Sequence, residues 1–531
     1  MTLPDLMDPL AGSSRQNGSD DVTGVFSMTD SIREHGNRLL RSAEDFISSP
    51  VVNPSGLKEP PPSPWAGSVV PSEARPFEDY IDGLISWLLP HSVNVGSPRC
   101  LANMSSIAPA FLRPIGEFVQ ALNQNLVKSE ASKGLSLIER QTIAMLHRAI
   151  YDLPGPFYQA QAENREATLG IGASGGSLAN LTALWIARNA ALASARPEQD
   201  AAQPVISNAL DRLGKTGTAV IVSELAHYSI DKAVGILGLG EGLVKVPVDA
   251  NHRVDLAALR DAVDDCGRTK KKIIAVIGLA GSTECGSIDS LGSVAAIARS
   301  VGAHFHVDAA WGAPLALSPV HRHKVAGIEL SDSVTVDAHK QFYAPVGNSF
   351  LLLRDPHAAQ VIEQDARYIF HCGAKDLGKR SLEGSRPGSS LFLHAALHVL
   401  GRNKLSELAV RNHENAGFMA ELIRKSEEFE LLGDPDTNIV VYRFIPARWR
   451  TPEKRRALSA VDESAINKFN ADLQRAQSEA GRSMVSRTTL FPNSAPVVAL
   501  RAVLGNPLTS HEDLRFILED QLKVAGEMAG G

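Results

Sequence analysis

The sequence predicts an α/β protein with a large domain on a doubly wound, largely parallel sheet and a small C-terminal α+β domain. Three observations indicate this. At 531 residues the chain is longer than one ordinary hydrophobic core accommodates. Short apolar runs of strand length alternate with helix-length segments through the middle of the chain, as in βαβ units. From about Asn403 the pattern changes to longer helices separated by single strands.

The first part of the chain, residues 1–75, is rich in Ser, Asp, Pro and Gly and is predicted to be flexible or arm-like, with one helix at Ser31–Ile47. Two roles stay open for it: an arm that wraps a partner subunit, or a leader without structure. Residues 76–150 are predicted to be helical. Apolar residues recur there with helical spacing in three stretches, Phe77–Leu89, Pro114–Val127 and Leu137–Ile150.

The large domain is predicted over residues 151–402 and the small domain over residues 403–531. The expected strands of the large domain are Ala167–Ile171, Thr218–Val222, Lys272–Leu279, His304–Val307 and Ser333–Val336. Its expected helices are Leu178–Asn189, Ser229–Ile236 and Leu291–Val301. The small domain is expected to contain, before a final helix, Leu405–Arg424 and Ser464–Ala480 as helices, and Thr437–Phe444 and Pro496–Val503 as strands.

Composition argues against several classes of partner. Charged residues make up 21% of the chain, the net charge is −6 and no basic stripe is present, so neither nucleic acid nor a membrane is expected as a partner. We find no apolar run near the roughly 18 residues that cross a bilayer and no signal-peptide pattern. The four cysteines are widely spaced, which favours reduced thiols in a cytoplasmic protein.

A glycine-rich turn, Gly170–Ser177, follows an expected strand and opens a helix. It has the spacing of a dinucleotide fingerprint, Gly170-x-Gly172-x-x-Gly175, but lacks the acidic residue expected about twenty positions later. The backbone N–H groups at the helix start and the Ser177 hydroxyl still favour an anion such as phosphate. The alternative is a tight turn that binds nothing.

Asp308 ends an apolar strand, and ligands of open α/β sheets gather at the carboxyl ends of strands. Strand alternation puts His304, His306 and Asp308 on one face, as in a metal-binding strand. No further His, Asp or Glu set completes a coordination shell in the sequence, so we predict no metal. A carboxylate that faces the ring nitrogen of a bound cofactor fits Asp308 better.

Lys340 stands just beyond the strand Ser333–Val336, next to His339 and before an apolar segment. An amine partly shielded from water beside another cation is a nucleophile that can hold an aldehyde as an imine. The alternative is an ordinary surface lysine. His227 follows the strand Thr218–Val222 and reaches the same sheet edge, either to lie flat on an aromatic ring or to make a local hydrogen bond.

In their order and spacing, these four segments resemble the group II pyridoxal-phosphate decarboxylases from about Ser92 to Leu514. Segments that look most like one bacterial branch, the pyridoxal-dependent aspartate 1-decarboxylases, are Leu122–Glu130, Asp337–Tyr343, Lys375–Gly378 and Leu382–Arg386. The resemblance implies the aspartate aminotransferase-like fold with a seven-stranded mixed or parallel sheet. It also implies pyridoxal 5'-phosphate as cofactor, an amino acid as small-molecule substrate, and a homodimer with shared active sites.

The same resemblance implies a role for each site residue. Lys340 would form the Schiff base with the cofactor, Asp308 would contact the ring nitrogen, and His227 would stack on the ring. Ala310 would pack on the opposite face of the ring. The other residues implied near the cofactor are Gly176, Ser177, Thr283, Asp337 and His339.

The implied reaction releases CO2 from an L-amino acid, and the branch favours an acidic substrate such as aspartate. Arg386 is the first candidate to bind the substrate carboxylate and Arg501 the second, because a guanidinium can bind a carboxylate through two hydrogen bonds. Either can equally be a structural ion-pair residue. Tyr368 is the candidate donor of the Cα proton, and Phe370 or His371 in that place would instead give an aldehyde.

Two departures argue against aromatic substrates. Ala338 and Gln341 stand where aromatic-amino-acid decarboxylases typically carry Pro and Trp. Other reactions of the same cofactor stay open, namely oxidative deamination, transamination or Cα–Cβ cleavage. A non-catalytic binding subunit is a further alternative, which the presence of Lys340, Asp308 and His227 argues against.

Overall fold

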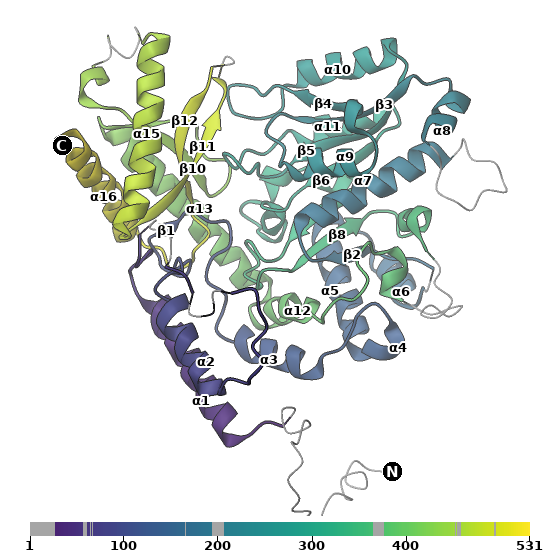
Figure 1. Cartoon of the computed structure of the whole chain (residues 1–531). Helices are drawn as coiled ribbons and strands as arrows, with labels where there is room; N and C mark the ends of the chain where they lie inside the picture. The colour runs from purple at the N-terminus through teal and green to yellow at the C-terminus, as the bar shows by residue number, and fades with distance from the viewer. Residues whose placement is uncertain are drawn as a thin grey trace, which may run out of the picture. The chain divides into compact units, whose positions relative to one another are not determined.

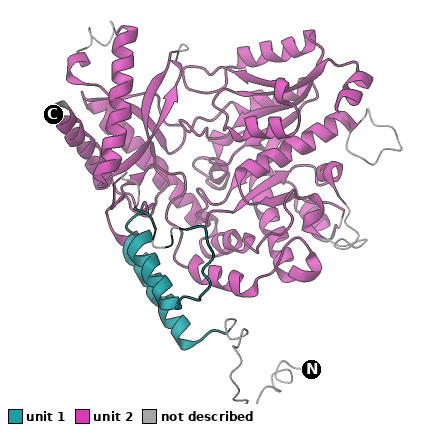
Figure 2. Ribbon diagram, in the orientation of Figure 1, with its two compact units in different colours: residues 1–46, 60–91 teal, residues 47–59, 92–531 magenta. Residues whose placement is uncertain are grey.

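The computed structural model describes residues 27–56, 61–63, 65, 67–164, 166–193, 206–364, 376–451, 453, 458–492 and 495–530. The chain divides into two compact units (Figure 2). The first is Met1–Phe46 with Pro60–His91, and the second is Ile47–Glu59 with Ser92–Gly531.

The first unit contains most of helix α1 (Asp30–Ser48), together with α2 (Phe77–Gly83) and the π-helical turn η3 (Leu84–Leu88). The predicted helices in this region are confirmed, although the second one changes from α to π geometry after Gly83. An ion pair of 2.5 Å joins Arg38 on α1 to Asp82 on α2. Both side chains are exposed to water, so the pair contributes little to stability.

A seven-stranded sheet forms the centre of the second unit, as the sequence predicts (Figure 1). Its order is β2-β8-β7-β6-β5-β3-β4. The strands are β2 (Gly170–Ala173), β3 (Gly217–Ser223), β4 (Leu243–Val246), β5 (Lys271–Leu279), β6 (His304–Asp308), β7 (Ser333–Asp337) and β8 (Ser349–Leu353). The strands β3 to β7 run parallel, and β8 is antiparallel to both of its neighbours.

Helices cover both faces of this sheet, which explains why its strands are apolar almost without alternation. Ala219 and Ile221 of β3 pack into a core with α5 (Gly134–Tyr151), α10 (Leu256–Arg268) and α11 (Leu291–Ser300). Val220 and Val222 point the other way, into a core with α7 (Gly176–Leu192) and α9 (Ser229–Ile236). The remaining helices of this part of the chain are α3 (Leu112–Leu122), α4 (Ser129–Ser132), α6 (Gly155–Glu163), α8 (Ile206–Leu213) and α12 (Ser390–Val399).

A five-stranded sheet has the order β1-β11-β12-β10-β9 and packs with three long helices. Its strands are β1 (Cys100–Leu101), β9 (Phe429–Leu431), β10 (Ile439–Phe444), β11 (Met484–Leu490) and β12 (Val497–Val503). The helices are α13 (Gly401–Lys425), α15 (Ala460–Ala480) and α16 (His511–Gly530). All but one of these elements lie within residues 403–531 or at their start. The exception is β1, which pairs in parallel with β11.

The elements predicted in the large and small domains are present within a few residues of their expected bounds. The predictions missed the short strands β1, β4 and β9, the strands β8 and β11, and the helices α6, α8, α10 and α12. None of the helices in the part of the chain that the structure describes has the length and apolar character that crossing a bilayer requires.

Candidate active site

The parallel strands β3, β6 and β7 end at one edge of the large sheet, where the loops that follow them line a cavity of about 290 Å³. His227 follows β3, Asp308 ends β6, and Lys340 follows β7. All three line the cavity, as expected for ligand-binding residues of an open α/β sheet. Other lining residues that the sequence pointed to are Gly176, Ser177, Thr283, Ala310, Asp337 and His339.

Helix α7 begins at Gly176, directly after β2 and its glycine-rich turn. A Cβ at Gly176 would stand 2.7 Å from Asp337 Oδ1, so only glycine permits this close approach of the turn to the end of β7. The N–H groups of Gly176 and Ser177 have no acceptor within the helix, whereas that of Leu178 donates to the carbonyl of Gly175 at 3.0 Å. Together with Ser177, which is exposed at the cavity wall, they form a site suited to an anion.

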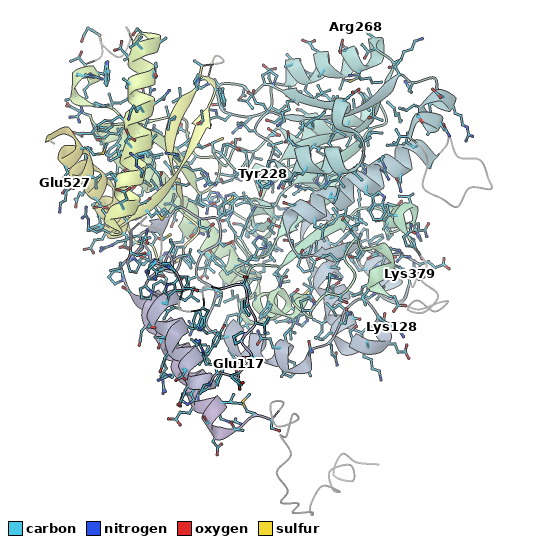
Figure 3. The ribbon with its side chains drawn as sticks, in the orientation of Figure 1. Glu117, Lys128, Tyr228, Arg268, Lys379 and Glu527 are labelled. Atoms are coloured by element: carbon cyan, nitrogen blue, oxygen red, sulfur yellow. The ribbon has the colours of Figure 1, made fainter. Side chains whose placement is uncertain are left out.

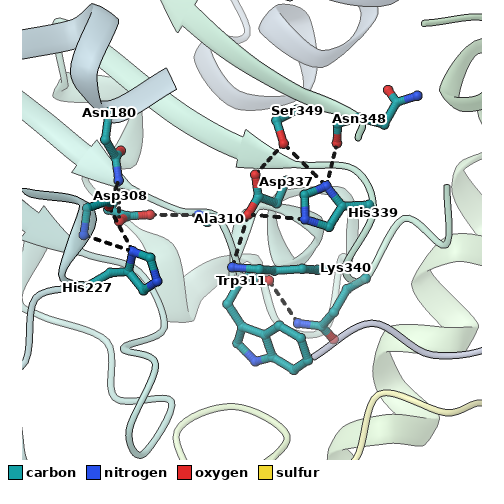
Figure 4. Close-up of polar contacts among 12 residues, drawn as sticks. Asn180, His227, Asp308, Ala310, Trp311, Asp337, His339, Lys340, Asn348 and Ser349 are labelled. Carbon is teal, nitrogen blue, oxygen red and sulfur yellow. Dashed lines mark hydrogen bonds and ion pairs between the residues drawn. The ribbon is translucent and has the colours of Figure 1, made fainter. Parts of the chain in front are cut away.

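Lys340 is held by a carboxylate inside the cavity (Figure 4). Its Nζ lies 3.0 Å from Asp337 Oδ2, and the two side chains are 15% and 5% exposed. Ser349 Oγ donates to Asp337 Oδ1 at 2.5 Å. His339 Nδ1 lies 3.0 Å from the carbonyl of Asn348, so Nδ1 carries a hydrogen and Nε2 is left facing Asp337 Oδ2 at 3.8 Å. The ion pair therefore fixes the position of the Lys340 amine, which remains partly accessible from the cavity.

Both oxygens of Asp308 accept hydrogen bonds: Ala310 N donates to Oδ1 at 3.1 Å, and Asn180 Nδ2 donates to Oδ2 at 2.9 Å. His227 Nδ1 accepts from Ser229, whose Oγ lies at 2.8 Å and whose N–H lies at 3.2 Å. The hydrogen of the ring is then on Nε2. Burial lowers the pKa of His227, although the carboxylate of Asp308 opposes the shift, so the ring is neutral near pH 7.

Arg501 on β12 approaches the cavity wall from the small sheet. Its Nε donates to the carbonyl of Thr283 at 2.7 Å and its Nη1 to Ser486 Oγ at 3.0 Å. Its Nη2 is buried and has no hydrogen-bond partner among the described residues. Burial lowers the pKa of Arg501 to about 10, while Glu284 raises it, so the guanidinium is charged at neutral pH. A buried cationic N–H group without a partner is suited to bind an anion.

Arg386 has a partner already. Two hydrogen bonds of 2.6 and 3.2 Å join it to Glu139 on α5, and the side chains are 7% and 1% exposed. Burial lowers the pKa of Arg386, but the carboxylate of Glu139 more than offsets this, and the net direction is upward. The pair lines a separate and smaller cavity beside Gly172. Within one chain, the geometry therefore favours Arg501 over Arg386 as an anion-binding residue.

Tyr368 and its alternatives Phe370 and His371 lie outside the described residues. The sequence analysis missed Asn180, which lines the cavity and donates to Asp308. A signal for it existed, because Asn180 is a polar residue in an apolar helix, one turn after Gly176 and on the same face. It also missed Tyr228, labelled in Figure 3, which is 59% exposed and lines the cavity.

The model of the pyridoxal-dependent decarboxylase conserved domain matches residues 68–445 of the chain. The chain belongs to this family. Aspartate 1-decarboxylase of Aliivibrio fischeri is 38% identical over 474 residues, which cover 87% of this chain and 85% of that protein. An L-2,4-diaminobutyrate decarboxylase of Rhizobium meliloti is 29% identical over 423 residues, with 78% of each chain covered.

Solved structures agree on the fold of this decarboxylase. Oryza sativa TDC, crystallised with PLP and tryptamine, superimposes with a TM-score of 0.81 at 21% identity, covering 94% of this chain and 99% of that one. Mouse CSAD in its apo form gives a TM-score of 0.76 at 22% identity, covering 92% and 98%. The predicted aspartate aminotransferase-like fold of the pyridoxal-phosphate enzymes is thereby confirmed.

The decarboxylase uses pyridoxal phosphate, and its cavity residues fit this cofactor. The start of α7, at Gly176 and Ser177, lines the cavity and offers backbone N–H groups and a hydroxyl that suit a phosphate. The same cavity contains an amine, at Lys340, and a carboxylate, at Asp308, which are the kinds of group that an aldehyde and a pyridine nitrogen require. The chain is thus an amino-acid carboxy-lyase, as the sequence predicted.

Proposed function

We propose that this decarboxylase removes the α-carboxyl group of an acidic amino acid, aspartate being favoured. The observation that carries the proposal is the buried Nη2 of Arg501, which has no partner among the described residues although Thr283, its neighbour, lines the cavity. A second carboxylate on the substrate would supply the missing acceptor. The 38% identical relative named aspartate 1-decarboxylase supports the same substrate class.

Each residue of the cavity has a proposed task. Lys340 holds the cofactor aldehyde, Asp308 binds the protonated ring nitrogen, and His227 and Ala310 cover the two faces of the ring. The phosphate is bound by the α7 turn, and the residues assigned to that end of the cavity are Gly176, Ser177, Asp337 and His339. Thr283 lies near the ring, and its carbonyl accepts a hydrogen bond of 2.7 Å from Arg501 Nε.

Pyridoxal phosphate supplies, when bound, an electron-poor ring that accepts the electron pair of the bond broken at Cα. The protein selects that bond by orientation, since the bond perpendicular to the ring plane is the one that breaks. We assign Arg501 to the side-chain carboxylate of the substrate. The α-carboxylate loses its charge as CO2 forms, so an ion pair to it would stabilise the ground state more than the transition state.

Protonation of Cα after loss of CO2 gives the amine, and we retain Tyr368 as the proposed donor. We also propose a cytoplasmic homodimer whose subunits share active sites, on resemblance to the family. In such a dimer the loop that contains Gly384–Arg386 is a candidate cross-subunit element. Arg386 would need to leave Glu139 to reach a substrate, and this is why Arg501 is preferred.

The test incubates the purified holoenzyme with aspartate, glutamate, 2,4-diaminobutyrate, tyrosine and tryptophan, and measures CO2, peroxide and amine together. We expect CO2 and 3-aminopropanoate from aspartate in equal amounts, without peroxide. Turnover of 2,4-diaminobutyrate in preference to aspartate would overturn the assignment of Arg501 to a side-chain carboxylate. Peroxide with an aldehyde product would overturn simple decarboxylation. Reduction with borohydride, absent in Lys340→Ala, checks the role of the lysine separately.

A further inference from the structure

Strand β6 carries three polar side chains on one face, His304, His306 and Asp308, inside a largely apolar sheet. Only Asp308 has a task in the proposed function. Together with Ser333 on β7, they form a buried line of hydrogen bonds that ends at the cavity. The distances are 2.7 Å from His304 Nε2 to Ser333 Oγ and 2.8 Å from Ser333 Oγ to His306 Nδ1.

Asn180 completes the line. Its Oδ1 lies 3.0 Å from His306 Nε2, and its Nδ2 lies 2.9 Å from Asp308 Oδ2. His306 and Ser333 are fully buried, and Asn180 is 1% exposed. Bonds at such depth are stronger than bonds at the surface, and each one polarises the next.

The chemistry of the groups fixes the direction of every bond. An ionised Asp308 can only accept, so Asn180 must present its NH2 group to it and accept with Oδ1. His306 must then donate from Nε2 and accept at Nδ1. The Ser333 hydroxyl donates its one hydrogen to His306 Nδ1, so it must accept a hydrogen bond from His304 Nε2. All donors therefore point toward Asp308, in the direction that favours a negative charge at that end.

Two observations agree with this direction. Burial, with a smaller contribution from His304, lowers the pKa of His306 to about 3, so His306 is the neutral ring that the scheme requires. The second hydrogen of Asn180 Nδ2 is directed to Ser229 Oγ at 3.0 Å, and Ser229 in turn contacts His227 Nδ1 at 2.8 Å. Asn180 thus joins the two residues assigned to the ring, Asp308 and His227.

The line does not conduct protons. An amide neither takes up nor releases a proton readily, so Asn180 interrupts any transfer between His306 and Asp308. What the line transmits is polarisation and orientation. We propose that His306, Ser333 and His304 are positioning residues that act through Asn180 to keep Asp308 ionised and aimed at the ring nitrogen of the cofactor.

Other charged groups also act on this region. At the cavity end, His227 is acted on electrostatically by Asp308 and by three groups outside the line, Lys340, Asp337 and Lys232. At the far end, Asp332 raises the pKa of His304, while burial lowers it more strongly. The groups outside the line, which are His227, Lys340, Asp337, Lys232 and Asp332, keep their places in a variant of Ser333.

The test measures cofactor binding, not turnover. Full-length apoenzyme is titrated with pyridoxal phosphate and with its deaza analogue, in which C–H replaces the ring nitrogen. Ser333→Ala removes the donor to His306 with little change in volume. We expect it to weaken pyridoxal phosphate binding by about tenfold and deaza binding by less than about twofold, because only the ring nitrogen senses Asp308.

Thr335→Val is the matched control. Thr335 lies on the same strand, is equally buried, and has its Oγ1 3.4 Å from His306 Nε2, but it is outside the line. Its variant should bind both compounds within about twofold of the wild type. Equal weakening of both compounds in Ser333→Ala, or the same selective loss in Thr335→Val, would overturn the proposal.

This inference rests on the proposed contact between Asp308 and the ring nitrogen, and one further variant separates the two. If Asp308→Asn leaves the preference for pyridoxal phosphate over the deaza analogue unchanged, the role of Asp308 itself is wrong. If Asp308→Asn abolishes the preference and Ser333→Ala does not affect it, only the line fails. In ¹⁵N-histidine spectra of the apoenzyme, His306 should carry its hydrogen on Nε2, and an Nδ1–H ring would contradict the direction assigned here.

Discussion

Two buried arginines near the cofactor cavity differ in how their charge is balanced. Arg386 has both of its terminal amino groups on Glu139, at 2.6 and 3.2 Å. Arg501 has two neutral acceptors, and its Nη2 has no partner in the described parts of the chain. A buried ion pair whose hydrogen bonds are all made has a structural role. A buried cation that lacks a hydrogen-bond partner lowers stability, so its presence indicates a role in binding.

The contrast predicts that substitutions at the two arginines have different effects. Substitution of Arg386 should lower the free energy of unfolding, and substitution of Arg501 should lower the catalytic activity. Sequence alone ranked them the other way, since Arg386 was the first candidate for the substrate carboxylate. The deciding fact is the position of Glu139, which lies 247 residues before Arg386 in the chain.

The largest effect is expected for Arg386→Met. It leaves the carboxylate of Glu139 buried without a cation, which costs about 3–5 kcal/mol of unfolding free energy. Urea unfolding of the variant, followed by circular dichroism, gives the measurement. The double variant Arg386→Met with Glu139→Leu should recover most of the loss, because no buried charge remains. A double variant as unstable as the single one would contradict this account.

Arg501→Gln should lower kcat/KM for aspartate about 100-fold, since the variant loses a charged hydrogen bond to the substrate. The unfolding midpoint should stay close to that of the wild type. Arg501→Lys keeps the charge without the planar fork and should lie between the two. A fall in stability like that of Arg386→Met, with kcat/KM unchanged in the folded fraction, would make Arg501 a structural residue as well.

The smallest effect is expected at Glu284, whose pKa is raised by burial and lowered in part by Arg501. The pKa of Glu284 is higher in the folded state than in the unfolded state. Below the unfolded-state pKa the group is protonated in both states and costs no stability, and the cost appears as pH rises through the folded-state pKa. Protonation also leaves Arg501 without an anionic neighbour. The KM for aspartate should therefore fall as pH is lowered toward the pKa of Glu284.

Glu284→Gln removes this titration. At pH 7 it should lower the KM for aspartate by about two- to threefold, and the KM of the variant should no longer follow pH in that range. Steady-state kinetics between pH 5 and 8 on both proteins give the comparison. A KM that rises in the variant would mean that Glu284 contacts the substrate directly.

The sequence was sufficient to predict which functional residues lie at the carboxyl ends of the strands. Lys340, Asp308 and His227 each follow an apolar run, and parallel strands bring their carboxyl ends to one edge whatever their order in the chain. The glycine turn was predictable for a similar local reason. Contacts between residues far apart in the sequence were not predictable. The residues next to Arg386 or Asn180 in the sequence do not indicate which distant side chain the fold places beside them.

The missed elements have physical causes as well. Strands β4 and β9 are short and partly exposed, so they lack the continuous apolar signal of β5. Strand β11 has mixed burial and contains charged and hydroxyl side chains. Strand β8 was seen only as an apolar segment, and its antiparallel direction follows from tertiary pairing with β2 and β7.

Strand β1 has a consequence for biosynthesis. Cys100 and Leu101 leave the ribosome early, but their partners Met484 and Val485 come near the end of the chain. At about 5–20 residues per second, this separation corresponds to a wait on the order of 20 to 80 s. Until then the edge of the small sheet does not exist. A C-terminal fragment that starts after residue 101 would lack its outer strand, and in the whole chain β1 can pair only after β11 has been synthesised.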